Sequence, residues 1–306
     1  MKFQILIDDN FCNYSTDGEL TGIDNKKILS IINDFEDGKW RYKKFQEFIW
    51  DNVKETALSI KERNALINDE GSTLGKAVEK LRLIDDPNDK DNGKGGEIAE
   101  IILYGIMKHH FKAIPVVPKI FYKQNKNDFA KGADSVHIVI ENNNTFSLWF
   151  GEAKFYDSII NSKLDKIVQS VNESLLLEKL KKENSLITNI SDLKDFTEIN
   201  DELKERIIKT LHEDTSIDEV KPILNIPILM VHECKITQKE TDNNPKYKND
   251  IITFHKDRAT EYFKKQIAKC STVHKYSEIK FHIILFPVPY KKQIEEKFLA
   301  IANALK

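Results

Sequence analysis

Residues 97–306 alternate between short apolar runs typical of β-strands and longer stretches whose apolar residues recur every three or four positions, as in amphipathic helices. The runs typical of strands cover residues 116–122, 134–141, 145–154, 222–231 and 279–286. The helical patterns cover residues 97–111, 158–180, 248–269 and 291–305. Residues 181–221 are charged and helical in pattern, as an insertion would be. This order of elements predicts an α/β fold with a mixed central sheet flanked by helices.

The residues before this segment predict a different organisation. Apolar positions at helical spacing in residues 26–35 and 40–66, after a short strand at residues 3–7, predict a mainly helical N-terminal region. Residues 85–96 concentrate charged residues and turn formers, which is typical of an exposed loop or a domain boundary. We therefore predict that the chain has two parts, a mainly helical region at residues 1–90 and an α/β domain at residues 91–306.

Composition excludes several classes of protein. The chain has 47 Lys and Arg residues against 49 Asp and Glu, so it is not a polycation that coats nucleic acid. Its three cysteines, Cys12, Cys234 and Cys270, lack the spacing of a disulfide framework or a thiolate zinc site. The start of the chain lacks a secretory pattern, and no apolar run approaches the roughly 18 residues that span a bilayer. We therefore expect a cytoplasmic protein without a membrane segment.

The predicted strand at residues 145–154 carries the most specific chemical signal. Side chains alternate along a strand, so Phe150, Glu152 and Lys154 share one face, and its apolar stripe ends in a carboxylate and an ammonium group. Asp134 begins the preceding strand, and an antiparallel hairpin would bring it beside the end of the next one. Two carboxylates with open positions for water and phosphate are ligands that Mg²⁺ prefers, with Mn²⁺ as a substitute. We therefore expect Asp134 and Glu152 to share one metal ion.

Two further residues are candidates for this site. Lys154 would steer a metal-activated water or stabilise negative charge on phosphorus, because it lies two residues beyond a ligand. Glu97 and Glu100 lie near one another at the start of a predicted helix that follows two glycines. We favour Glu97 as a third acidic ligand, since it is nearer the helix start. The alternative is that Glu152 and Lys154 only end a solvated strand.

These residues carry a resemblance to known nucleases. Asp134, seventeen intervening residues, and then Glu152, Ala153 and Lys154 resemble the motif of the PD-(D/E)XK nuclease superfamily, with Ala133 in place of its proline. The fuller pattern is similar to the HamA family of the Hachiman anti-phage defence system, and it consists of GGEIAEIILYG from position 95, KGAD from position 131 and GEAKFY from position 151. The resemblance implies a restriction-endonuclease-like core and a Mg²⁺-dependent deoxyribonuclease. It also implies a superfamily 2 helicase partner, HamB, that restrains the nuclease.

The resemblance covers about residues 90–306 and implies further site residues. The backbone carbonyl of Ala153 would complete the metal coordination. A polar side chain on the helix after the Glu-x-Lys strand would also contribute, and Gln169 is our candidate because its surroundings are more apolar than those of Lys163 and Lys166. The alternative for Gln169 is an ordinary solvated helix face.

Four lysines interleave with aromatic residues near the start of the second predicted strand, a pattern suited to gripping phosphates and stacking on bases. They are Lys119, Lys123, Lys126 and Lys131. The alternative is that these lysines are simply solvated. A weakly acidic chain would bind DNA poorly alone, which fits a helicase partner that supplies affinity for DNA in a stable heterodimer.

We therefore predict a metal-dependent DNA nuclease that acts in bacterial anti-phage defence under the control of a helicase. Two alternatives from other classes stay open. One is a non-catalytic scaffold that keeps the nuclease fold to bind a helicase or DNA. The other is a restriction endonuclease that acts alone and cuts DNA into discrete fragments.

Overall fold

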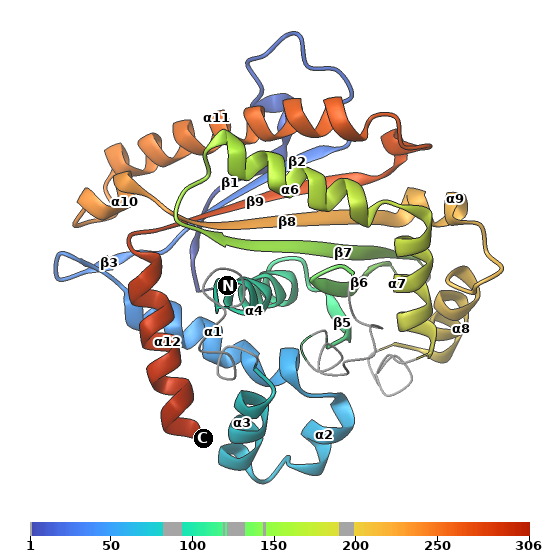
Figure 1. Cartoon of the computed structure of the whole chain (residues 1–306), viewed down its shortest axis with the longest axis horizontal. Coiled ribbons are helices and arrows are strands. Elements are labelled where there is room, and N and C mark those ends of the chain that lie inside the picture. The colour runs from blue at the N-terminus through green and yellow to red at the C-terminus, as the bar shows by residue number, and fades with distance from the viewer. Residues whose placement is uncertain (1, 82–93, 119, 121–131, 143–144, 190–198) are drawn as a thin grey trace.

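The computed structural model arranges the chain around a seven-stranded sheet (Figure 1). It describes residues 2–81, 94–118, 120, 132–142, 145–189 and 199–306. The strands of the sheet are β1 (Gln4–Asn10), β2 (Lys26–Ile32), β5 (Ile114–Val117), β6 (Ser135–Asn142), β7 (Thr145–Tyr156), β8 (Leu224–Glu233) and β9 (Lys280–Val288). Two short strands, β3 (Phe35–Glu36) and β4 (Lys39–Trp40), form a separate ribbon. The predicted α/β class with a mixed central sheet is confirmed.

The order of strands across the sheet is β1-β2-β9-β8-β7-β6-β5. Strands β2, β9, β8 and β7 run parallel to one another, whereas β1 at one edge and β6 and β5 at the other are antiparallel to their neighbours. The central strands β8 and β9 are buried along almost their whole length, as expected for strands that helices cover on both faces. The site residues of β7 thus lie where the parallel part of the sheet meets its antiparallel edge.

Helices cover both faces of the sheet, with α6 and α11 on one face and α1, α4 and α12 on the other (Figure 1). The helices are α1 (Tyr42–Ala57), α2 (Ile60–Ala65), α3 (Glu70–Glu79), α4 (Lys94–His109), α6 (Asn161–Ser174), α7 (Leu177–Asn189), α8 (Asp201–Thr210), α9 (Ile217–Val220), α10 (Lys235–Lys239), α11 (Pro245–Cys270) and α12 (Lys291–Leu305). Among the residues that the structure describes, no helix combines the length and the apolar character that a membrane crossing requires.

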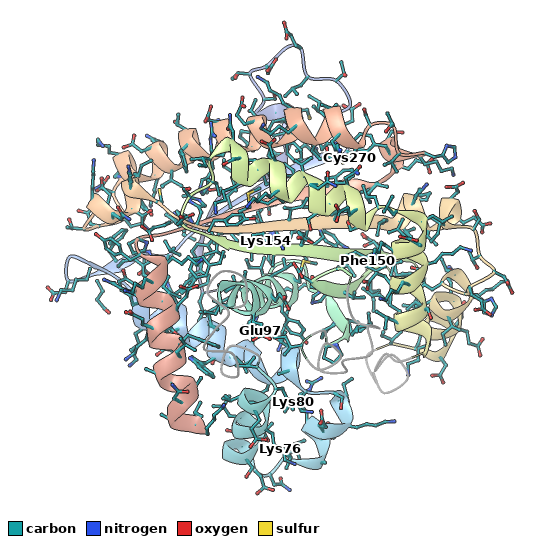
Figure 2. All side chains as sticks on the ribbon, viewed as in Figure 1. Lys76, Lys80, Glu97, Phe150, Lys154 and Cys270 are labelled. Carbon is teal, nitrogen blue, oxygen red and sulfur yellow. The ribbon has the colours of Figure 1, made fainter. Side chains whose placement is uncertain are left out.

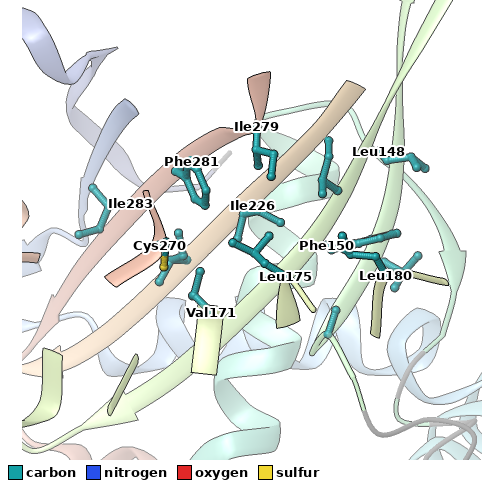
Figure 3. Close-up of a cluster of buried hydrophobic side chains, with 14 of the residues drawn as sticks. Leu148, Phe150, Val171, Leu175, Leu180, Ile226, Cys270, Ile279, Phe281 and Ile283 are labelled. Atoms are coloured by element: carbon teal, nitrogen blue, oxygen red, sulfur yellow. The ribbon is translucent and has the colours of Figure 1, made fainter. Parts of the chain in front are cut away.

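The alternation of side chains along β7 divides the core into two layers. Leu148 and Phe150 belong to the cluster between the sheet and helices α6 and α11, which also contains Val171 of α6, and Leu180 lies beside Phe150 (Figure 3). Trp149 and Phe155 belong to the cluster on the opposite face, with the apolar side chains of α1, α4 and α12. Residues at even positions of β7 therefore face α6, which determines where Glu152 and Lys154 lie.

The prediction of a helix over residues 26–35 is wrong. This stretch forms β2, which pairs with β1 on one side and with β9 on the other, and continues into the short ribbon. Ile28 and Ile31 are fully buried, each in the cluster of a different face. An apolar run that fits a helix also fits a doubly covered strand, and its β-branched isoleucines favour the strand. The helical pattern predicted over residues 40–66 is confirmed by α1 and α2.

Strands β1 and β2 thus share the sheet with strands from the predicted second part of the chain. The division between residues 1–90 and 91–306 falls in the stretch 82–93, outside the described residues. It therefore stays a prediction. The first ninety residues supply helices, as predicted, but they also supply two strands of the central sheet.

Several predicted element boundaries differ from the structure. The strand expected over residues 116–122 is β5, which begins at Ile114 and ends at Val117. The single helix expected over residues 158–180 is two helices in the structure. The first, α6, ends at Ser174, and the second, α7, begins at Leu177 and contacts β5.

A proline inside the strand predicted over residues 222–231 would be expected to confine the regular part to its second half. This expectation is wrong, since β8 is continuous through Pro227, which pairs with His282 of β9. Next to the Pro227 ring lies Gly151 of β7, which has no side chain to compete for the space. The register of β8 with β7 also skips Ile226 and Pro227, so the strand accommodates a proline that has no N–H to donate.

Candidate active site

The β6–β7 hairpin brings two carboxylates together. Ser135 pairs with Gly151 across the hairpin, and Asp134 just before it donates its backbone N–H to the Gly151 carbonyl over 2.7 Å. A side chain at Gly151 would place its Cβ only 2.2 Å from Ser135 Oγ and 2.7 Å from Leu103 Cδ2, so glycine permits this close packing. The pairing places Asp134 beside the segment of β7 that carries Glu152.

Lys154 lies between the two carboxylates. Its Nζ is 2.6 Å from Glu152 Oε1 and 3.4 Å from Asp134 Oδ2. Asp134 Oδ2 also accepts the backbone N–H of Ala153 over 3.0 Å. Glu152 is buried, whereas the Lys154 side chain is 31% exposed, so Lys154 is the member of this pair that solvent reaches. The structure thus brings Asp134, Glu152 and Lys154 into one cluster.

Burial and neighbouring charges shift the pKa values of this cluster. Burial raises the pKa of Glu152, and the nearby Asp134 carboxylate raises it further, against the opposing effects of Lys154 and Ser170. Burial would by itself lower the pKa of Lys154, but the charges of Asp134 and Glu152 outweigh it and raise that pKa. The ammonium group is therefore held in its charged form by the two carboxylates.

Ser170 on α6 is a site residue that the sequence reasoning missed. Its Oγ donates a hydrogen bond of 2.6 Å to Glu152 Oε1. The predicted candidate, Gln169, is exposed and donates to Glu173 Oε1 on its own helix. The signal that could have found Ser170 is helical phase, because it follows the buried Ile167 by three residues and so lies beside the stripe that faces the sheet.

Glu97 lies on the other side of the sheet. It is a buried residue in the first turn of α4, and this helix packs against the face of β7 that carries Ala153 and Phe155. Figure 2 labels Glu97 on α4 and Lys154 on β7. Within the described ranges, no three His, Cys, Asp or Glu side chains are placed so that together they could hold a metal ion. Glu97 is therefore not brought together with Asp134 and Glu152 as a direct third ligand.

The donors that do meet are of the type that Mg²⁺ uses. Asp134 and Glu152 each supply a hard carboxylate, and both are held against a cation in this structure, namely the Lys154 ammonium group. Ala153, whose backbone carbonyl is a further predicted ligand, directly follows Glu152 and donates its N–H to Asp134 Oδ2. The chemistry of this donor set fits a divalent cation, although it offers two side-chain ligands rather than three.

The predicted DNA-contacting lysines fall in a stretch that the structure does not describe. They are Lys119, Lys123, Lys126 and Lys131. Their proposed contacts with phosphates therefore stay predictions. In the sequence, this stretch lies between Pro118, which follows β5, and Gly132, two residues before Asp134, and Ile120 is its one described residue.

Comparison with known proteins assigns the chain to a protein family. No curated protein matches it. The family model described as HamA matches residues 6–302, which is almost the whole chain and includes the Asp134, Glu152 and Lys154 cluster. The match extends well before residue 90, so it also covers β1, β2 and the helices α1 to α3. The chain therefore belongs to the HamA family, whose members are proteins of the Hachiman defence system.

Proposed function

We propose that the protein is a metal-dependent deoxyribonuclease of the PD-(D/E)XK type that serves as an effector of Hachiman defence. The observation that carries the proposal is the ammonium group of Lys154, which lies 2.6 Å from Glu152 and 3.4 Å from Asp134 at the end of a hairpin. Two carboxylates that can hold a metal ion, with a lysine beside them, are residue types that suit phosphodiester hydrolysis by a metal-activated water. Membership of the HamA family supports the same function.

The residues have separate roles in this proposal. Asp134 and Glu152 would hold Mg²⁺ or Mn²⁺, together with the backbone carbonyl of Ala153. The ion would supply Lewis acidity at the scissile phosphate and lower the pKa of a water molecule. Lys154 would orient the attacking water or stabilise charge that develops on the phosphate oxygens. Glu97, which lies on the opposite face of the sheet, would contribute through water rather than directly.

A helicase partner belongs to the proposal. The chain carries 47 basic and 49 acidic residues, so it has no excess positive charge with which to bind the DNA backbone by itself. A superfamily 2 helicase, HamB, would supply affinity for DNA and restrain the nuclease within a heterodimer. The lysines at positions 119, 123, 126 and 131 would then guide DNA toward the cluster. Co-purification of the two proteins at moderate salt tests this partnership directly.

Plasmid cleavage tests the proposed activity. Supercoiled plasmid and Mg²⁺ are incubated with the wild type and with the double variant Glu152→Ala, Lys154→Ala, each with and without the helicase and ATP. A matched control, Glu173→Ala with Lys166→Ala, removes the same charges from the exposed face of α6. We expect cleavage by the wild type and by the control, and none by the site variant.

The other outcomes distinguish the alternatives. If none of the proteins cuts DNA under any condition while all of them bind the helicase equally, the catalytic proposal fails and a scaffold role remains. If the wild type produces discrete fragments without helicase or ATP, it acts as a restriction endonuclease that needs no motor. Progressive loss of plasmid only in the presence of the helicase supports a nuclease under helicase control.

A further inference from the structure

A second buried carboxylate lies next to the cluster without belonging to it. Glu183 of α7 is only 3% exposed, and its Oε1 accepts the backbone N–H of Ala133 over 2.9 Å. Ala133 directly precedes Asp134, so this bond fixes the backbone at the point where the chain enters the site. Burying a carboxylate is costly unless hydrogen bonds compensate it, which gives this contact a specific structural role.

The turn before Asp134 is shaped to fit this carboxylate. A Cβ added at Gly132 would lie 1.8 Å from Glu183 Oε1, so the residue facing the carboxylate must lack a side chain unless Glu183 moves. Leu180 and Ile187, one on either side of Glu183 in α7, are buried in the core beneath α6. These contacts hold α7 in place without the help of the bond to Ala133, so the position of Glu183 does not depend on that bond.

Consecutive backbone donors hold the turn from opposite sides. The N–H of Ala133 binds Glu183, and the N–H of Asp134 binds the Gly151 carbonyl of β7 over 2.7 Å. The motif that the sequence resembles has proline at position 133, and proline has no N–H to donate. Alanine at this position allows α7 to hold the turn, which leaves the Asp134 carboxylate against Ala153 N–H and Lys154 Nζ.

We propose that Glu183 is a positioning residue for Asp134: through the Ala133 N–H it holds the Gly132–Asp134 turn, and with it the orientation of the metal-binding carboxylate. This inference rests on the proposed function, because it treats Asp134 as a metal ligand. It assigns to α7 a part of the site that the Asp, Glu-x-Lys motif does not contain. Glu183 acts through its acceptor oxygen, not through contact with metal or DNA.

Three variants of the full chain test the inference. Glu183→Ala removes the acceptor, and Glu183→Gln keeps an oxygen that can accept the same N–H. Leu186→Ala, the matched control, loosens a buried contact of α7 without touching the bond. The first measurement is hydrogen exchange of the Ala133 amide without metal. We expect faster exchange in Glu183→Ala, and exchange close to that of the wild type in the other two variants.

The second measurement is Mn²⁺ binding by calorimetry, with thermal unfolding as the check on folding. We expect Glu183→Ala to weaken Mn²⁺ binding by about tenfold or more, as loss of a group that orients a ligand does. Glu183→Gln should restore most of the affinity, and Leu186→Ala should retain it. DNA cleavage should follow the same order among the variants.

The outcomes separate this inference from the proposed function. Unchanged exchange and unchanged Mn²⁺ binding in Glu183→Ala overturn the positioning role while the nuclease proposal stands. Equal losses in Glu183→Gln and Glu183→Ala overturn it as well, because the negative charge and not the acceptor would then be required. If the wild type neither binds Mn²⁺ nor cuts DNA but exchange at Ala133 responds as expected, the contact is structural and the proposed function fails.

Discussion

Two lysines of the same sheet, Lys26 in β2 and Lys154 in β7, lie in very different surroundings. Lys26 is fully buried, and its Nζ binds Asn25 Oδ1 at 2.6 Å and lies 4.3 and 4.6 Å from the ring centres of Tyr276 and Phe281. These partners carry no formal charge. Burial therefore dominates and lowers the pKa of Lys26 to about 7.

Lys154 shows the opposite balance. Burial acts on it in the same direction, but Asp134 and Glu152 lie within ion-pairing distance and raise its pKa instead. The comparison teaches that depth in the core does not by itself decide the charge of a lysine. Neighbouring carboxylates decide it, and they lie beside Lys154 in β7 but not beside Lys26 in β2.

The largest expected difference between the two lysines is in DNA cleavage. Lys154→Met should lower the rate of plasmid cleavage by roughly 100- to 1000-fold, because it removes a preorganised cation from the site. Lys26→Met, which removes a lysine that is fully buried away from the site, should leave the rate within a few fold of the wild type. Initial rates in the plasmid assay, with helicase and ATP present, measure both.

An equal loss of cleavage in the two variants would contradict the distinction between Lys154 as a site residue and Lys26 as a residue outside the site. It would mean that either substitution acts through general destabilisation. Thermal unfolding of each variant, recorded at the assay pH, separates this case from a specific loss of activity, because it shows whether the variant is folded at the assay temperature. A folded, inactive Lys26→Met protein would require a link between β2 and the site that the surroundings of Lys26 do not indicate.

The second difference lies in the pH dependence of stability. The pKa of Lys26 falls from 10.5 to about 7 on folding, so between these values the unfolded chain binds a proton that the folded chain does not. The free energy of unfolding should therefore rise with pH, by about 2 kcal/mol between pH 7 and pH 9. Below pH 7 both states are protonated, and this contribution becomes constant.

Urea unfolding of the wild type and Lys26→Met across pH 6 to 9 measures this effect. The variant has no titrating group at the position, so the difference in unfolding free energy between the two proteins should change with pH as described. A difference that stays constant across the range would show that Lys26 keeps its proton when buried. Lys26 and Lys154 would then both be charged in the folded protein, and they would differ only in the groups that surround them.

The smallest expected effect concerns Ser170, which supports the cluster around Lys154. Ser170→Ala removes the hydrogen bond to Glu152 and should weaken Mn²⁺ binding and plasmid cleavage by about tenfold. Ser174→Ala is the control, since that hydroxyl binds the Val171 carbonyl within α6. If the two variants behave alike, the Ser170 contact does not orient Glu152 during the reaction.

Much of the fold was predictable because its elements carry their own patterns. The closing helix at 291–305 has the predicted bounds, and the hairpin of β6 and β7 follows from two alternating runs around an asparagine-rich turn. The error over residues 26–35 has a clear cause. Periodicity alone does not distinguish a helix from a strand that is buried on both faces, and only pairing with β9 decides between them.

The candidate site divides in the same way. Asp134, Glu152 and Lys154 lie within 21 consecutive residues of one hairpin, so strand alternation was enough to predict that they meet. Ser170 and Glu183 come from helices, and their contacts depend on how each helix rotates against the sheet. Gln169, one position from Ser170, points elsewhere for that reason.

The sequence by itself determined the α/β class, the order of most elements and the meeting of two carboxylates with a lysine. These features depend on short-range periodicity and on local pairing, which residue types encode directly. The tertiary structure decided the identity of Lys26–Ile32 as a strand, the position of Glu97 across the sheet and the contact of Glu183 with Ala133. Such features depend on packing between segments far apart in the chain, where the burial of whole surfaces outweighs local preference.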